Sequence, residues 1–290
     1  MRRDLRPIVG MLLIASTTVT GQETPAKQFR SLLKEYNSAA GAFRRAKNDQ
    51  QRKQAVVQIG KFARKFLDLA DKHPKDPTAL RALRQATQAI GSTDSAAQNA
   101  WEINTSHFPN DQNDGSVQRL VRIVQRDHLK SDKIGPIIDR MRYGYRLEFA
   151  ECLELIHRTT PHRTIRGLAV LALARNLKDR LRMLQLAKDR AELTKRYART
   201  FGRDYLRNLQ RANLAKRIEP LLQLAMKYHN VKMPYGGTVA QQAKSELFEM
   251  KVLGVGKPAP EIVGRDQDDK PFKLSDYRGK TVLLYFWVQF

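Results

Sequence analysis

Residues 59–70 read IGKFARKFLDLA, and this stretch decides the fold class because its apolar side chains recur at helical spacing. One apolar stripe follows intervals of three, four, three and one residues and consists of Ile59, Phe62, Phe66, Leu69 and Ala70. Such spacing places these side chains on one face of a helix. The polar, proline-containing stretch 71–77 ends that helix, and Asp76 or Thr78 is expected to cap the next one.

The same helical pattern covers most of the region 22–253. Further stripes or helical stretches occupy residues 80–90, 147–156, 165–173, 181–197 and 206–229. The stripe at 165–173 is apolar on most sides, which predicts a buried helix. Prolines interrupt the pattern at intervals, at Pro74, Pro77, Pro109, Pro136, Pro161 and Pro234. Because this rhythm is typical of stacked helical hairpins, we expect a mainly α fold, a tetratricopeptide-like α-hairpin array without a clean repeat period.

The first 21 residues have the composition of a secretory signal peptide. Arginines within residues 1–7 precede an apolar run at 8–15, and small residues follow it. We place cleavage near Gln22 and expect export to the periplasm or cell envelope. The apolar run is shorter than the roughly 20 residues that a membrane span needs, so no span is expected after signal removal. The alternative is a short buried helix with a basic cap.

The composition is that of a chain that can bury a core and carries a large positive charge. Among its 290 residues, 41% are hydrophobic and 28% are charged, which excludes a disordered tail and a multi-span membrane protein. Lysine and arginine number 53 against 29 acidic residues, and the net charge is +24. The segment 158–217 alone holds 17 basic and four acidic residues, a net charge of +13.

Three interpretations of this basic segment are open. A phosphate-tracking groove for nucleic acid is disfavoured, because the sequence contains no nucleic-acid motif and export argues against such a partner. Association with anionic lipid headgroups or wall polymers is the second interpretation. A solvated arginine-rich face is the third, and we favour it.

The helical pattern stops at Gly254, and the residues that follow predict a β-hairpin. Pro258 and Pro260 indicate an extended lead-in. Residues 261–264 and 272–274 predict two short strands that flank a polar turn.

A helical turn and a strand are predicted after the hairpin. Ser275 is expected to cap a single helical turn that Gly279 ends. Residues 281–287 are β-branched, aliphatic and aromatic without alternation. A continuous apolar run of this length is typical of a strand buried on both faces of a sheet.

Residues 254–290 resemble the start of the redoxin family, the thioredoxin-fold thiol–disulfide oxidoreductases and thiol-specific antioxidant proteins. The matching stretches are VGKPAP at 255–260, DQDD at 266–269, LSDYRGK at 274–280 and VLLYFW at 282–287. The framework positions that match the family are Gly256, Pro258, Pro260, Leu274, Asp276, Gly279, Lys280, Phe286 and Trp287. The match is best to the exported branch, and it implies an incomplete thioredoxin-like α/β segment with no cofactor and no metal.

The resemblance implies catalytic cysteines that this sequence does not contain. In the family the pattern continues as Phe-Trp-x-x-Trp-Cys-x-x-Cys, and Phe290 stands where the second tryptophan would be. The first redox cysteine is expected immediately after Phe290, so no catalytic residue carries over. The resemblance therefore implies a truncated chain, by a nonsense codon, a UGA codon for selenocysteine or a frameshift, that is inactive as written.

The single cysteine and two histidines of the helical region are not expected to form a substitute site. Cys152 is flanked by Glu151 and Glu154, and nearby carboxylates raise the pKa of a thiol. We expect a buried structural cysteine. His157 and His162 are five residues apart, with Pro161 between them. This spacing does not place them on one helical face as a metal pair, so surface or capping roles are expected.

The sequence thus predicts a signal peptide at 1–21, a helical region at 22–253 and the N-terminal fragment of a thioredoxin-like redoxin domain at 254–290. An intact relative would act on protein disulfides or peroxides. The alternative function is a helical-repeat interaction module that binds an envelope protein, or an anionic polymer or lipid through its basic face.

Overall fold

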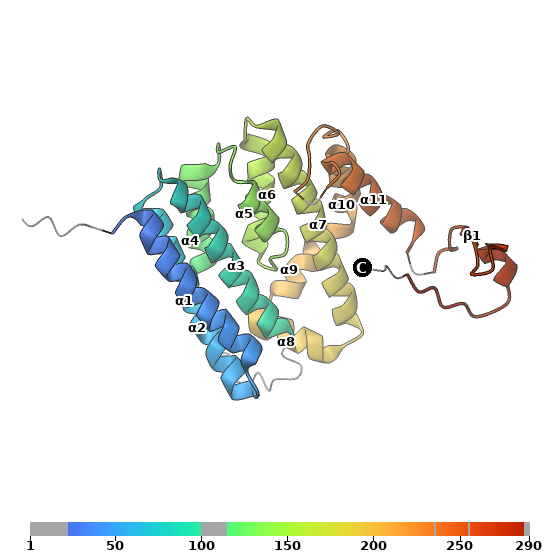
Figure 1. Cartoon of the computed structure of the whole chain (residues 1–290), viewed down its shortest axis with the longest axis horizontal. Coiled ribbons are helices and arrows are strands. Elements are labelled where there is room, and N and C mark those ends of the chain that lie inside the picture. Colours follow the sequence, from blue (N-terminus) through green and yellow to red (C-terminus); the bar gives the residue numbers. More distant parts are fainter. Residues whose placement is uncertain (1–22, 100–114, 235, 255, 287–290) are drawn as a thin grey trace, which may run out of the picture.

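The computed structural model describes residues 23–99, 115–234, 236–254 and 256–286, and this part of the chain is mainly α (Figure 1). It contains eleven α-helices and one two-stranded sheet, which confirms the mainly α prediction. The predicted signal peptide at 1–21 lies outside the described residues.

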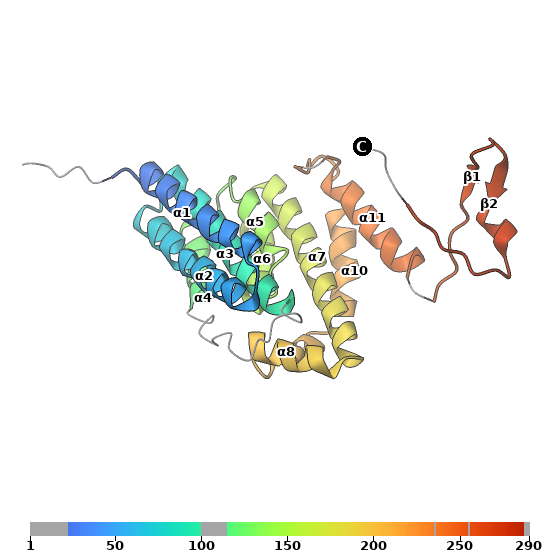
Figure 2. The same cartoon turned by 60° about the horizontal axis from the view of Figure 1, so that its bottom comes forward.

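The first three helices lie side by side at the blue end of the chain (Figures 1 and 2): α1 (Pro25–Arg45), α2 (Asp49–Lys72) and α3 (Pro77–Asn99). Short connections make consecutive helices antiparallel neighbours. The predicted stripe of α2 is buried, and Phe66 and Ala70 are fully enclosed. Phe66 packs against Phe29 and Tyr36 of α1, with ring centroids 5.8 and 6.0 Å apart. Aromatic packing therefore joins the first hairpin.

Short polar side chains fix the starts of α2 and α3. Asn48 Oδ1 accepts a hydrogen bond from the backbone N–H of Gln51 at 2.9 Å. Asp76 Oδ1 accepts one from the backbone N–H of Thr78 at 2.7 Å. Of the two predicted caps for α3, Asp76 is the one that the structure uses, and it satisfies a donor that the helix itself leaves free.

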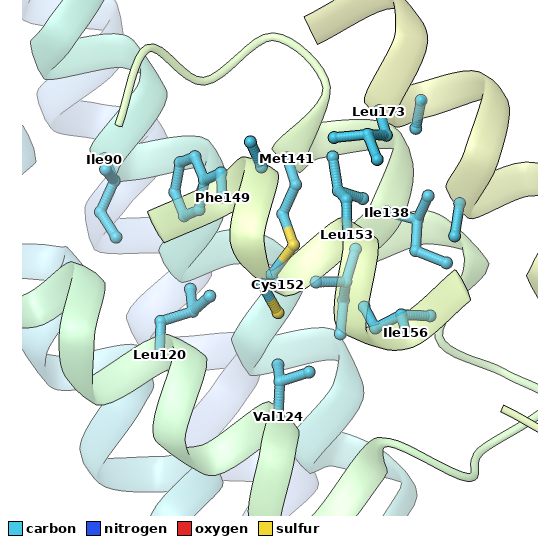
Figure 3. Packing of buried hydrophobic residues seen from close by; sticks show 14 of the residues in the cluster. Ile90, Leu120, Val124, Ile138, Met141, Phe149, Cys152, Leu153, Ile156 and Leu173 are labelled. Atoms are coloured by element: carbon cyan, nitrogen blue, oxygen red, sulfur yellow. The ribbon is translucent and has the colours of Figure 1, made fainter. Parts of the chain in front are cut away.

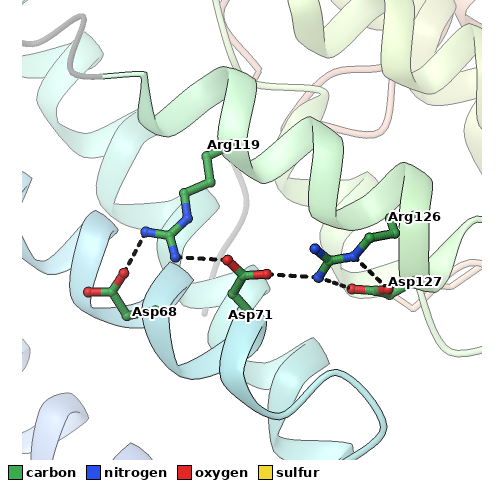
Figure 4. Close-up of polar contacts among 5 residues, drawn as sticks. All are labelled: Asp68, Asp71, Arg119, Arg126 and Asp127. Atoms are coloured by element: carbon green, nitrogen blue, oxygen red, sulfur yellow. Dashed lines mark hydrogen bonds and ion pairs between the residues drawn. The ribbon is translucent and has the colours of Figure 1, made fainter.

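The next elements are short: α4 (Ser116–Ile123), a π-helical turn (Val124–His128), α5 (Gly135–Met141) and α6 (Leu147–Thr159). A chain of ion pairs ties α2 to α4 and to the π-helical turn (Figure 4). Arg119 lies 2.5 Å from Asp68 and 3.0 Å from Asp71, while Arg126 bridges Asp71 at 2.7 Å and Asp127 at 2.6 Å. Hydrogen bonds from the two arginines lower the pKa of Asp71.

The longest helix, α7 (Arg163–Lys188), lies between α5 and α6 on one side and α10 (Leu214–Ala225) on the other (Figures 1 and 2). Its first half is buried on most sides, as the sequence predicts. Gly167 permits this packing, because a Cβ at that position would lie 2.8 Å from the ring of Tyr228.

Two stretches that the sequence predicts as continuous helical segments are each divided in the structure. The stretch predicted at 181–197 is divided into α7 and α8 (Ala191–Phe201) at Asp189 and Arg190. The stretch predicted at 206–229 is divided into α9 (Tyr205–Arg211) and α10 at Asn213, whose φ of 48° is left-handed. Conversely, Pro220 lies inside α10 without ending it.

One ion pair lies inside the helical core. Arg146 Nη2 donates to Asp94 Oδ1 at 2.7 Å, and Arg146 Nε donates to Asp94 Oδ2 at 3.0 Å. The Asp94 side chain is 0% exposed and that of Arg146 is 9% exposed. Arg180 is also buried and donates to the backbone carbonyl of Arg146. The pair joins the end of α3 to the start of α6.

The last helix, α11 (Val239–Val252), begins with a capping box and packs on α7 and α10. Thr238 Oγ1 accepts from the backbone N–H of Gln241, whose side chain accepts from the backbone N–H of Thr238. Beyond α11 come β1 (Val263–Arg265), β2 (Pro271–Lys273) and a 3₁₀ turn (Leu274–Tyr277). In Figures 1 and 2 this red segment stands apart from the helices.

Candidate functional site

The C-terminal hairpin forms close to where the sequence predicts it. β1 and β2 pair antiparallel, with Gly264 opposite Phe272. Asp266 organises the turn, because its Oδ1 accepts from the backbone N–H of Asp268 and of Lys270, each at 2.9 Å. Asp269 takes a left-handed φ of 62° at the tip. Local turn chemistry therefore suffices to close this hairpin.

The predicted helical turn after the hairpin is present, but its capping residue differs from the prediction. Asp276 Oδ2 accepts from the backbone N–H of Lys273 at 2.9 Å, whereas Ser275 donates its own N–H to Glu261. Ser275 therefore does not cap the turn. Gly279 follows with a φ of 82°, a left-handed conformation that favours glycine.

The other framework positions lie along an exposed path. Gly256 also has a φ of 82°. Four more framework residues lie in the same segment. Pro260 and Leu274 are half-buried, whereas Pro258 and Lys280 are exposed. Trp287 lies outside the described residues.

Residues 281–286 do not form the buried strand that their composition predicts. They are not part of a strand, and their side chains face solvent. Leu283 is 91% exposed, Tyr285 81% and Phe286 82%. A central strand needs neighbouring strands on both sides, and the only strands in the described residues are β1 and β2. The apolar run is therefore left uncovered.

Cys152 is a buried structural cysteine, as predicted. It is 0% exposed and lies among apolar side chains, including Leu120 and Met141 (Figure 3). Burial raises the pKa of its thiol to about 12. The direction of the shift is the predicted one, but its cause is desolvation and not the neighbouring carboxylates Glu151 and Glu154. Such a thiol is a poor nucleophile at neutral pH.

The two histidines are used separately in backbone contacts. His157 Nδ1 lies 3.2 Å from the carbonyl oxygen of Arg166, and His162 Nε2 lies 2.9 Å from that of Lys130. Within the described ranges, no group of three or more histidine, cysteine or acidic residues is arranged to hold a metal ion.

Many basic residues of the segment 158–217 have structural partners. Arg163 donates to the carbonyl oxygen of Lys227 at 2.8 Å, and Arg217 pairs with Glu154 at 2.8 Å. Other basic side chains are exposed, among them Lys188, Arg190, Lys195, Arg203 and Arg211. The segment is therefore partly structural and partly a solvent-facing basic surface.

The structure brings together three arginines that the sequence does not single out. Arg84 of α3, Arg142 just after α5 and Arg175 of α7 line one cavity. They are far apart in the sequence and share no motif, so no local signal could have grouped them.

The described helices are too short or too polar for any of them to cross a membrane. No family model, curated protein or solved structure matches this chain. The redoxin resemblance therefore depends on the residues of the segment itself, at 255–287.

Proposed function

We propose that this chain is a redoxin-type protein, in which a helical module leads into the opening of a thioredoxin-like domain. The observation that carries the proposal is the hairpin of β1 and β2, followed by a one-turn helix and a left-handed Gly279. These elements occur in the order that the resemblance implies. The exposed apolar run at 281–286 supports the proposal further, because such a run requires a sheet to cover it.

The proposed chemistry of an intact relative is thiol–disulfide exchange or peroxide reduction, which needs a reactive thiolate. The 290-residue chain contains only Cys152, which is buried and has a raised pKa. We therefore propose that the 290-residue chain by itself has no dithiol activity. Insulin reduction and peroxide consumption measure this directly, with Cys152→Ala as the control. Activity of the wild-type chain above that control would contradict the proposal.

A graft tests the redoxin proposal itself. The remainder of an exported redoxin domain, starting at its Cys-x-x-Cys motif, is fused after Phe290. If residues 281–286 form the predicted buried strand when the rest of the sheet is supplied, the fusion should reduce insulin. The same segment should then become protected from proteolysis. The matched control is the same fusion with Leu283→Asp, which places a charge in the proposed strand. A folded graft that leaves 281–286 protease-sensitive would refute the proposal.

The second candidate function is a helical-repeat interaction module. The helical body has its own core, and exposed lysines and arginines gather in α8, α9 and the residues beside them. Sedimentation with phosphatidylglycerol vesicles, compared with phosphatidylcholine vesicles, tests this function. Binding to the anionic vesicles that disappears at high salt would favour it, and equal binding to both vesicle types would exclude recognition of anionic lipid by the basic face.

Export to the periplasm or cell envelope remains part of the proposal. N-terminal sequencing of the protein recovered from the envelope fraction tests it. A mature chain that begins near Gln22 is the expected result, whereas a retained Met1 in that fraction would contradict cleavage.

A further inference from the structure

A small cavity with an apolar floor lies between α3, α5, α7 and the loop that follows α10. Its volume is about 360 Å³, within the lower range of small-molecule sites. The apolar part of the lining includes Ile138, Leu168, Leu171, Ala172, Met233 and Pro234. A floor of this kind suits a short hydrocarbon chain.

The polar part of the cavity is predominantly cationic. Arg84, Arg142 and Arg175 line it, and Asp139 is the single acidic residue of the lining. Arg175 already has partners, since its Nε lies 2.9 Å from Glu246 Oε1. Within the described ranges, Arg84 makes no ion pair and is exposed to solvent. The cavity therefore has a cation at its rim that can bind an anion.

Arg142 is a second cation of the lining, and Asp139 is its ion-pair partner. Its side chain is 19% exposed, and its Nε lies 3.4 Å from Asp139 Oδ1 without a hydrogen-bond partner among the described residues. Burial lowers the pKa of Arg142, and the like charge of Arg175 lowers it further. An anion placed beside Arg142 would give its buried, unpartnered Nε–H an acceptor.

We propose that this cavity binds a medium-chain fatty acid, with its hydrocarbon chain on the apolar floor and its carboxylate at Arg84 and Arg142. Charge-assisted hydrogen bonds from guanidinium groups are the strong form of carboxylate recognition. Asp139 repels an incoming anion, but it is outnumbered by the arginines of the lining. This site is independent of the redoxin proposal, because it lies entirely within the helical body.

Calorimetric titration of the full 290-residue chain with decanoate, below its micellar concentration, tests the site. Decanol and acetate are the matched probes, since each carries only one of the two proposed features. Decanoate is expected to bind at least tenfold more tightly than decanol, because charged hydrogen bonds are lost with the alcohol. Affinity should rise roughly fourfold for each added methylene until the cavity is full. Equal affinity for decanoate and decanol, or no binding of decanoate, would overturn the proposal.

Two variants locate the binding. Arg84→Gln changes an exposed side chain and should leave the fold intact, while Arg142→Gln removes the half-buried cation. Each should weaken decanoate binding at least tenfold and leave decanol binding unchanged. The control is Arg207→Gln, an exposed arginine on α9 outside the cavity, which should bind decanoate as the wild type does. If Arg84→Gln, with unchanged circular dichroism, also binds decanoate as the wild type does, the carboxylate site is refuted.

Discussion

Asp94→Ala is expected to destabilise the helical body more than most single substitutions would. Among the residues that the structure describes, Asp94 is the only carboxylate that hydrogen-bonds the buried guanidinium of Arg146, and it does so through both of its oxygens. Because alanine removes the acceptors and leaves the cation inside, the variant isolates the cost of an unpaired buried charge.

The magnitude follows from the exposure of the pair. Breaking a buried ion pair by deleting one partner costs about 3–5 kcal/mol. Arg146 is 9% exposed, so little water can replace the lost carboxylate. Arg180 lies beside it, 2% exposed, and its like charge adds to the cost. We therefore expect a loss toward the upper end of that range, which is a large fraction of the stability of an ordinary domain.

Urea unfolding followed by far-ultraviolet circular dichroism measures the loss of unfolding free energy. The matched control is Asp68→Ala, which breaks an ion pair of similar length on the surface. Asp68 lies 2.5 Å from Arg119 but is 64% exposed, so its loss should cost less than about 1 kcal/mol.

A double variant separates the unpaired charge from other effects. Asp94→Leu combined with Arg146→Met replaces the pair by apolar groups, and it should recover most of the loss because no unpaired Arg146 cation remains. Two results would refute the reasoning: Asp94→Ala costing no more than Asp68→Ala, or the double variant being no more stable than Asp94→Ala.

Four further predictions concern other parts of the chain. Cys152 should react with Ellman's reagent only after denaturation, because a pKa of about 12 leaves about one thiolate in 100,000 at pH 7. Burial lowers the pKa of His128, so the unfolded chain takes up its proton first, and stability should decline as the pH falls below about 6.5. His128→Gln should flatten this decline in urea titrations at several pH values. Asp71→Asn should cost about 1 kcal/mol or less, and high salt should shrink the difference from wild type. A chain that ends at Leu253 should melt at the temperature of the full chain and aggregate less, as light scattering would show, because the exposed apolar run is removed.

Helices and turns were predictable from the sequence because their determinants are local. The stripe through Phe62 and Phe66 repeats within a few residues, and the structure buries it. Asp266 and Gly279 likewise act on backbone groups close to them in sequence. The predicted break between α2 and α3 is confirmed for the same reason, with Asp76 as its cap.

The features that the sequence did not reveal depend on contacts between distant segments. Nothing near Asp94 or Arg146 indicates that they meet across 52 residues. No proline marks the division between α9 and α10 at Asn213, whereas Pro220 lies inside α10 without ending it. The run at 281–286 was misjudged for a related reason. Its composition is typical of a buried strand, but a strand becomes buried only when other strands pack beside it, and this depends on residues outside the run.

The position of the C-terminal segment relative to the helical body depends on α11, and the two halves of this helix are held differently. Its first half is anchored by burial, since Val239 and Ala243 are fully enclosed. Its second half combines ion pairs with apolar contacts: Glu246 and Glu249 bind Lys178 of α7 at 2.5 and 2.6 Å, and Leu247 and Met250 pack partly buried against the core. Salt weakens partly exposed ion pairs more than apolar contacts. The second half leads directly to residues 256–286, so the attachment of the hairpin should be sensitive to ionic strength while the helical core is not. Lys178, one residue of the basic segment 158–217, thus contributes to how the two parts of the chain are joined.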